Sequence, residues 1–115
     1  MELSVKLAEN VYILTLKGEL DARTAPQLTR FFHEKITLEP PQVVADLKGL
    51  EYSSSAGIRA FLGMARETRH RGGDLRIAEV LPGVEKVFKL SKFDKIVRIF
   101  SSVEDAIDSF KSVTQ

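Results

Sequence analysis

The stretch Glu51-Tyr-Ser-Ser-Ser-Ala-Gly-Ile-Arg59 joins two segments of different periodicity. Residues 43–47 before it, Val-Val-Ala-Asp-Leu, form a short apolar run typical of a strand that is buried on both faces. Residues 56–71 after it repeat apolar side chains at intervals of three and four, which predicts an amphipathic helix. Three consecutive serines therefore lie where a strand ends and a helix begins.

The position of these serines leaves several roles open. The first turn of a helix has unpaired N–H groups, and its dipole favours negative charge. A hydroxyl there can cap the helix, act as a nucleophile or accept a phosphoryl group. A cap is worth about 1 kcal/mol and needs only one hydroxyl. The small residues Ala56 and Gly57 would leave the turn approachable by another protein, so capping and recognition or modification of a hydroxyl both stay open.

Four further strands are predicted outside this stretch. Residues 3–7 alternate between apolar and polar side chains, and residues 11–16 are almost continuously apolar, with the turn candidate Glu9-Asn10 between them. These two segments predict a hairpin. Residues 75–80 and 96–100 predict two more strands.

Three more helices are predicted from start and stop signals. One is expected to begin at Thr24, with Gln27 completing a capping box, and to end by Pro40-Pro41. Pro82-Gly83 opens another, and Ser101 with Glu104 forms a capping box for the last. Gly72-Gly73 should end the helix that follows the serines. The residues expected to face the core are Leu28, Phe31, Phe32, Ile36, Ile58, Phe61, Leu62, Ala65, Val84, Val87, Phe88, Val103, Ala106, Ile107 and Phe110.

The resulting order is β-β-α-β-α-β-α-β-α over residues 1–115, which we interpret as a single α/β domain. Alternating strands and helices imply right-handed crossovers onto a mostly parallel sheet of about five strands with four helices. The first strand should pair antiparallel at one side of this mixed sheet. Residues 18–24 and the serine turn both follow strands, so they should lie at the same sheet edge.

Composition argues against several classes of protein. The net charge of +1 disfavours a dedicated nucleic-acid binder, and no apolar run approaches the ~20 residues of a membrane helix. The N-terminus lacks the pattern of a signal peptide, and there is no cysteine for disulfides or thiolate metal sites. We therefore expect a cytoplasmic protein without direct nucleic-acid or membrane partners.

The residues do not suggest an enzyme. His33 and His70 lack a second ligand at metal spacing, and a nucleophile elbow would need glycine where Ser53 stands. We predict no catalytic residue, metal or cofactor, and we interpret both histidines as solvated. The basic cluster Arg66, Arg69, His70 and Arg71 is interpreted as a solvated helix end, where cations are favoured by the dipole.

Several motifs in this order resemble the STAS domain, specifically the single-domain bacterial anti-sigma factor antagonists. The motifs are Gly18-Glu19-Leu20-Asp21, Val43-Val44-Ala45-Asp46-Leu47-Lys48-Gly49-Leu50, Ser54-Ser55-Ala56-Gly57-Ile58, Leu90-Ser91-Lys92-Phe93-Asp94-Lys95-Ile96 and Ser102-Val103-Glu104-Asp105-Ala106. The first of these should leave the second strand as a loop. Together the motifs cover nearly the whole chain.

The resemblance implies a partner switch. In such proteins an anti-sigma factor that is also a serine kinase, of the histidine-kinase-like ATPase fold, binds the unphosphorylated antagonist and phosphorylates one serine. A PP2C-type phosphatase resets the switch. Ser55, two residues before Gly57, takes the acceptor position. Ser54 stands where relatives usually carry aspartate, so Ser54 is both the expected helix cap and a rival acceptor.

The expected partner-binding residues are Asp21, Thr24, Ser53, Ser54, Ser55, Ala56, Gly57 and Arg59. The alternative function is a constitutive STAS interaction or scaffold module, in stress signalling or beside a transporter, that is never phosphorylated.

Overall fold

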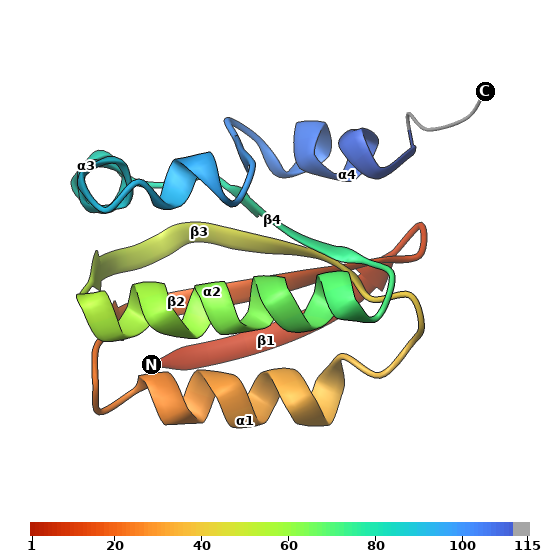
Figure 1. Ribbon diagram of the computed structural model, residues 1–115, viewed down its shortest axis with the longest axis horizontal. Helices are drawn as coiled ribbons and strands as arrows, with labels where there is room; N and C mark the ends of the chain where they lie inside the picture. Colours follow the sequence, from red (N-terminus) through yellow and green to blue (C-terminus); the bar gives the residue numbers. More distant parts are fainter. Residues whose placement is uncertain (112–115) are drawn as a thin grey trace.

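Five strands form one sheet in the order β1-β2-β3-β4-β5, and helices pack on both of its faces (Figure 1). The computed structural model describes residues 1–111. The strands are β1 (Glu2–Ala8), β2 (Val11–Leu20), β3 (Gln42–Ser53), β4 (Asp74–Ala78) and β5 (Ile99–Phe100). The helices are α1 (Ala25–Lys35), α2 (Ser55–His70), α3 (Pro82–Leu90), the short 3₁₀ helix η1 (Phe93–Lys95) and α4 (Val103–Lys111).

The predicted topology is confirmed. β1 pairs antiparallel with β2, and each remaining neighbouring pair is parallel. Glu9 and Asn10 both have positive φ, 54° and 66°, which matches the right-handed twist of a tight hairpin. Since the chain moves across the sheet in one direction, right-handed crossovers place α1, α2 and α3 on the same face.

Alternation along the central strands produces two cores of unequal size. Leu14 and Leu16 of β2 point into the larger core, together with Phe32 of α1 and Phe61 of α2. The intervening residue Ile13 belongs to the smaller core, which α4 covers with Ala106 and Ile107 on the opposite face. All the residues expected to face the core are buried or packed against one of these two clusters.

Two central strands are longer than predicted. The motif Gly18-Glu19-Leu20 continues β2 rather than forming a loop, and β3 runs on to Ser53. Both extensions pair with each other in parallel, with Gly18 opposite Leu50 and Leu20 opposite Ser53. Register shifts and the positive φ of 115° at Gly18 bend this part of the pair. The extension was not predicted because these residues alternate poorly between apolar and polar side chains. It depends instead on pairing between segments that are distant in sequence.

The last strand is shorter than predicted, since β5 holds only Ile99 and Phe100. The preceding residues form η1 and a turn, which bury Phe93 and Val97 in the larger core. Phe93 packs 4.6 Å from Phe88 and 6.0 Å from Phe61, measured between ring centroids. Burial of Phe93 and Val97 in this way is more favourable than extending β5 through residues 96–98.

Neither predicted capping box forms. The Thr24 side chain does not cap α1; its Oγ1 accepts from the N–H of Asp21 and donates to the carbonyl of Glu19. At α4 the cap is Ser102 rather than Ser101, because Ser102 Oγ accepts from the N–H of Asp105 at 3.0 Å. In each case the geometry of the local turn, and not the sequence spacing alone, determines which hydroxyl bonds to a backbone group.

The basic end of α2 is not simply solvated. Arg69 Nε binds Asp74 at 2.7 Å, and Arg71 forms ion pairs with Glu39 and Glu67. These contacts tie the helix end to the segments that flank β3 and β4. The predicted stop at Gly72-Gly73 is confirmed, since Gly72 has a φ of 86° and the Gly73 N–H returns to the Thr68 carbonyl at 2.8 Å.

Candidate functional site

The serine turn lies at the carboxyl end of the parallel strands. The N–H of Ser54 donates to the carbonyl of Leu20 at 2.9 Å, which joins the turn to the end of β2. α1 and α2 run side by side in the same direction, so both helices begin at this end of the sheet (Figure 1). The two loops that were expected at one sheet edge therefore lie next to each other.

The three serine hydroxyls have different surroundings. Ser53 is 2% exposed, and its Oγ donates to the Ser54 carbonyl. Ser54 is the N-cap of α2, since its Oγ accepts from the N–H of Ala56 at 3.2 Å. Ser55 is the first residue of the helix and is exposed, and its hydroxyl makes no hydrogen bond within residues 1–111. Of the three hydroxyls, the Ser55 hydroxyl is the one that a second protein can reach freely.

Gly57 packs the start of α2 against the end of β2. A Cβ at this position would lie 2.5 Å from Ser53 Oγ and 2.8 Å from Leu20 Cδ2. Such overlap explains the glycine, because no larger residue fits without moving the helix. Ser53 and Gly57, two of the expected partner-binding residues, are both buried in the structure.

The Asp21 carboxylate organises the neighbouring loop. Its Oδ1 accepts from the N–H groups of Arg23 at 2.9 Å and Thr24 at 3.2 Å, and the side chain is 23% exposed. Partial burial alone would raise the pKa of Asp21, but these hydrogen bonds and the nearby Arg23 guanidinium lower its pKa below the ordinary value. Asp21 therefore holds its loop in place as an anion and presents negative charge beside the serine turn.

The lowered pKa of Asp21 predicts a pH-dependent contribution to stability. A depressed folded-state pKa stabilises the domain above the unfolded pKa, near 3.8, and this contribution is lost as pH falls through the folded pKa. Asp21→Asn keeps an oxygen acceptor without the charge. Its thermal midpoint should therefore lie below that of the wild-type domain at pH 7 and approach it near pH 3 in calorimetry.

Asp21→Ala is the matched control, because it removes the acceptor and should stay destabilised at both pH values. A gap between the wild type and Asp21→Asn that does not change with pH would contradict the assignment.

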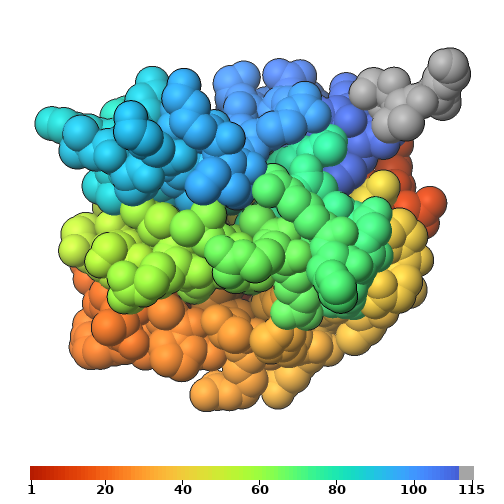
Figure 2. Space-filling view, viewed as in Figure 1, coloured from red at the N-terminus to blue at the C-terminus, as the bar shows by residue number. Residues whose placement is uncertain are grey.

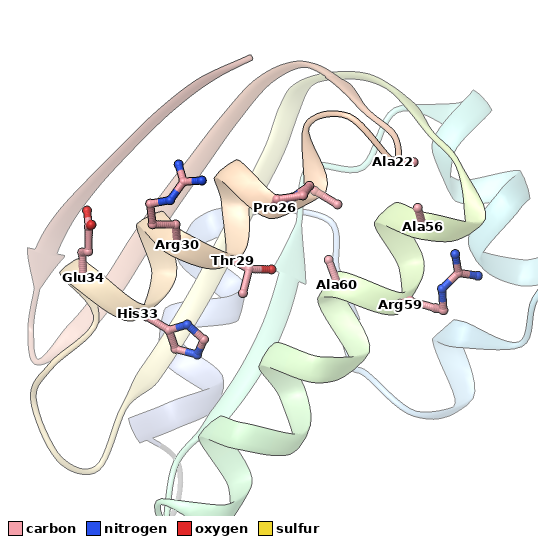
Figure 3. Close-up of a pocket in the computed structure, with 10 residues that line it drawn as sticks. Ala22, Pro26, Thr29, Arg30, His33, Glu34, Ala56, Arg59 and Ala60 are labelled. Atoms are coloured by element: carbon pink, nitrogen blue, oxygen red, sulfur yellow. The ribbon is translucent and has the colours of Figure 1, made fainter.

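A hollow of about 700 Å³ opens between α1 and α2 beside the serine turn. Ala22, Ala25 and Pro26 line it from one side, and Ala56 and Ala60 line it from the other. Figure 3 shows Thr29 and Ala60 facing each other across this space, while Arg59 lies on the outer side of α2. We call this hollow the groove between α1 and α2. Its lining is mainly apolar with some cationic side chains, and it lies beside the exposed Ser55 hydroxyl. The sequence pointed to the small residue Ala56, but it gave no sign that Ala22, before α1, and Ala25, at its start, lie across the hollow from it.

His33 Nε2 lies 2.8 Å from Glu67 Oε1, so this exposed histidine forms a hydrogen bond that joins α1 to α2. Residues 1–111 contain no group of three His, Cys, Asp or Glu side chains that could hold a metal ion. None of the helices in this part of the chain has the length and apolar character needed to cross a membrane.

Comparison with known proteins gives related sequences over almost the full length. The chain is 33% identical over 112 residues to BtrV, a candidate anti-sigma factor antagonist of Bordetella bronchiseptica, with 97% of each chain covered. It is 25% identical to the anti-sigma F factor antagonist of Paenibacillus polymyxa, covering 99% of this chain and 98% of that one.

Solved structures share the fold. Unphosphorylated SpoIIAA, an anti-sigma factor antagonist, superimposes with a TM-score of 0.79 at 21% identity, covering 99% of this chain and all of that one. SpoIIAA from Bacillus is also known in a phosphorylated form, with a TM-score of 0.69. Residues 2–106 match the family model of the STAS domain. The sheet order, the helix positions and this match together show that the chain belongs to the STAS domain family.

Proposed function

We propose that the protein is an anti-sigma factor antagonist that exchanges partners when Ser55 is phosphorylated. The unphosphorylated form binds an anti-sigma factor that is also a serine kinase, and the phosphorylated form is released. The names of the related proteins support the first part of this proposal. The second part is supported by the division of roles among the three serines.

The single observation that carries the Ser55 assignment is the state of its two neighbours. Ser53 is buried and Ser54 caps α2, so phosphorylation of either would break a structural contact. Ser55 can accept a phosphoryl group without losing a hydrogen bond within residues 1–111. The helix N-terminus would also stabilise the added charge.

Phosphorylation would change the surface strongly without requiring a new fold. A phosphate adds about −1.5 to −2 charge at pH 7. It would stand next to the groove between α1 and α2 and near the Asp21 carboxylate, so a partner that fits the neutral hydroxyl would meet both steric overlap and unfavourable charge. Arg59, one helical turn after Ser55, is exposed and could hold the phosphate on the unbound antagonist.

The proposed contact surface follows from exposure. It comprises Asp21, Thr24, Ser54, Ser55, Ala56 and Arg59, and it excludes Ser53 and Gly57 because both are buried. The proposed kinase has the histidine-kinase-like ATPase fold, and a PP2C-type phosphatase would remove the phosphate. Both enzymes are proposed because the chain resembles the anti-sigma factor antagonists.

Incubation with the cognate kinase and ATP, followed by peptide mass spectrometry, tests the acceptor. Phosphate should appear on Ser55 in the wild-type domain and disappear in Ser55→Ala. Ser54→Ala is the matched control: it loses the cap, worth about 1 kcal/mol, and should keep the phosphate. Phosphate on Ser54 alone, or on neither serine, would refute the assignment. In a constitutive scaffold module, Ser55→Ala and Ser55→Asp would both bind the partner as the wild type does.

A further inference from the structure

The cations of this protein are unevenly distributed. Residues 85–98 carry five Lys and Arg against two acidic residues, which leaves twelve cations against fourteen acidic residues in the rest of the chain. The protein as a whole is nearly neutral, with a net charge of +1, but this short segment is strongly basic. The segment comprises most of α3, then η1 and the turn before β5.

Four lysines of this segment lie one turn apart along the chain. Lys86 and Lys89 are three positions apart on α3, opposite the buried side chains of Val84 and Phe88. The N–H of Lys92 donates to the Lys89 carbonyl, and the N–H of Lys95 donates to the Lys92 carbonyl, both at 3.1 Å. All four lysines are exposed. We call Lys86, Lys89, Lys92 and Lys95 the lysine ridge; the α3–η1 segment covers the region above α2 in Figure 2.

Little within residues 1–111 neutralises the lysine ridge. Lys89 pairs with Glu85 at 3.8 Å, and the other three lysines form no ion pair in the described part of the chain. Asp94 lies between Lys92 and Lys95 in the sequence, but its Oδ1 is buried without a hydrogen-bond partner. The carboxylate is therefore turned partly inward and leaves the two lysines beside it facing solvent.

Two large aliphatic side chains are exposed beside these lysines. Leu90 is 76% exposed at the end of α3, and Ile96 is 49% exposed just after η1. Neighbouring residues of the same segment, Phe88, Phe93 and Val97, are buried in the larger core. The segment is thus anchored from inside as part of the rigid domain, and it presents both positive charge and apolar tips on its outer side.

Contrary to the expectation from composition that the protein has no membrane partner, we propose that the lysine ridge binds the surface of an anionic lipid bilayer, with Leu90 inserted shallowly between headgroups. Clusters of four or more cations are attracted to anionic leaflets. Each cation adds to the binding free energy without having to adopt a fixed geometry. Lysine is depleted at specific protein interfaces, where arginine and aromatic residues are enriched. A ridge made only of lysines with aliphatic tips fits diffuse headgroup charge better than an acidic protein.

The lysine ridge and the proposed phosphorylation site lie on different elements of the fold. Ser55 lies at the start of α2 near α1, whereas the lysine ridge lies on α3 and η1. The negative excess elsewhere on the domain would orient the protein with the ridge toward the membrane. The inference does not depend on the proposed function, because it requires neither a kinase nor phosphorylation.

Cosedimentation of the whole protein with vesicles tests the proposal. The probe is phosphatidylcholine containing about one-third phosphatidylglycerol, compared with phosphatidylcholine alone. The protein should partition into the anionic vesicles at about 0.05 M salt and be released at about 0.5 M salt. The double variant Lys86→Gln with Lys95→Gln should lower the partition coefficient about ten- to thirtyfold. Leu90→Ser should lower it a further few-fold.

The double variant Lys6→Gln with Lys17→Gln is the matched control, because both lysines are exposed on the β1–β2 hairpin and the net charge changes equally. This control should partition nearly as the wild type does. Absence of partitioning, or equal losses in both double variants, would overturn the proposal. Binding to soluble polyglutamate without binding to vesicles would assign the ridge to an acidic protein and would also overturn it.

Discussion

Gly73→Ala should destabilise the domain by about 3 kcal/mol or more, which is the largest single-residue effect that we expect on stability. A Cβ at this position would overlap the carbonyl group of Pro41 and lie 2.9 Å from its nitrogen. Pro41 is buried, and the N–H of Asp74 donates to its carbonyl at 3.2 Å as β3 and β4 begin to pair. Relief of the overlap would therefore separate the first residues of two central strands. Denaturant titration measures the loss.

Gly63→Ala provides the matched control. Nothing lies within 4 Å of a Cβ built at Gly63, which is exposed in the middle of α2. Alanine should stabilise the helix there by about 0.5 to 1 kcal/mol. Equal changes in the two variants would show that backbone freedom, rather than contact with Pro41, determines the effect at Gly73.

Ser55→Asp should weaken binding to the cognate anti-sigma factor at least about a hundredfold, or about 3 kcal/mol. The carboxylate would stand at the exposed first residue of α2, beside the groove and next to Ser54, which is bonded to Leu20 just before Asp21. Loss of a neutral contact and the burial of an unpaired charge both act in this direction. Isothermal titration calorimetry of the wild type and of Ser55→Asp against the same partner measures the difference in affinity.

Ser54→Asp separates the effect of position from the effect of charge. Aspartate caps a helix as well as serine does, and the resemblance to the STAS family implies an aspartate at this position. We expect the affinity of Ser54→Asp to stay within a few-fold of the wild type. Comparable losses in both variants would mean that any negative charge at the turn blocks binding, which would remove the special role of Ser55.

Local sequence patterns were sufficient for the chain order of the five strands and four α-helices and for the directions of the strands. The hairpin, the helix stop at Gly72-Gly73 and the apolar stripes depend on residues that are close in sequence. The extension of β2 to Leu20 depends instead on pairing with residues more than thirty positions away, which alternation in one strand cannot reveal. The same applies to the contact of Arg69 with the Ile96 carbonyl and to the ion pair of Arg71 with Glu39, because both partners lie on loops that are distant in sequence.

The candidate site was also only partly predictable. The sequence identified three serines at a helix start, but it could not assign their hydroxyls. Ser53 is buried because Gly57 lets α2 approach the end of β2, and this approach depends on the packing of Leu20. The groove between α1 and α2 requires the two helices to run side by side, which follows from the topology and not from any motif.

The hydrogen bond from Ser54 to Leu20 has a kinetic consequence. Together with the contact from Ser53 Oγ to the Ser54 carbonyl, it fixes the backbone of the turn before any partner arrives. A preorganised surface loses little conformational entropy on association, so rearrangement of the turn should not limit the association rate. A phosphoryl group added to such a turn would act mainly by shortening the lifetime of the complex. Partner exchange could then follow the modification as soon as the bound partner dissociates.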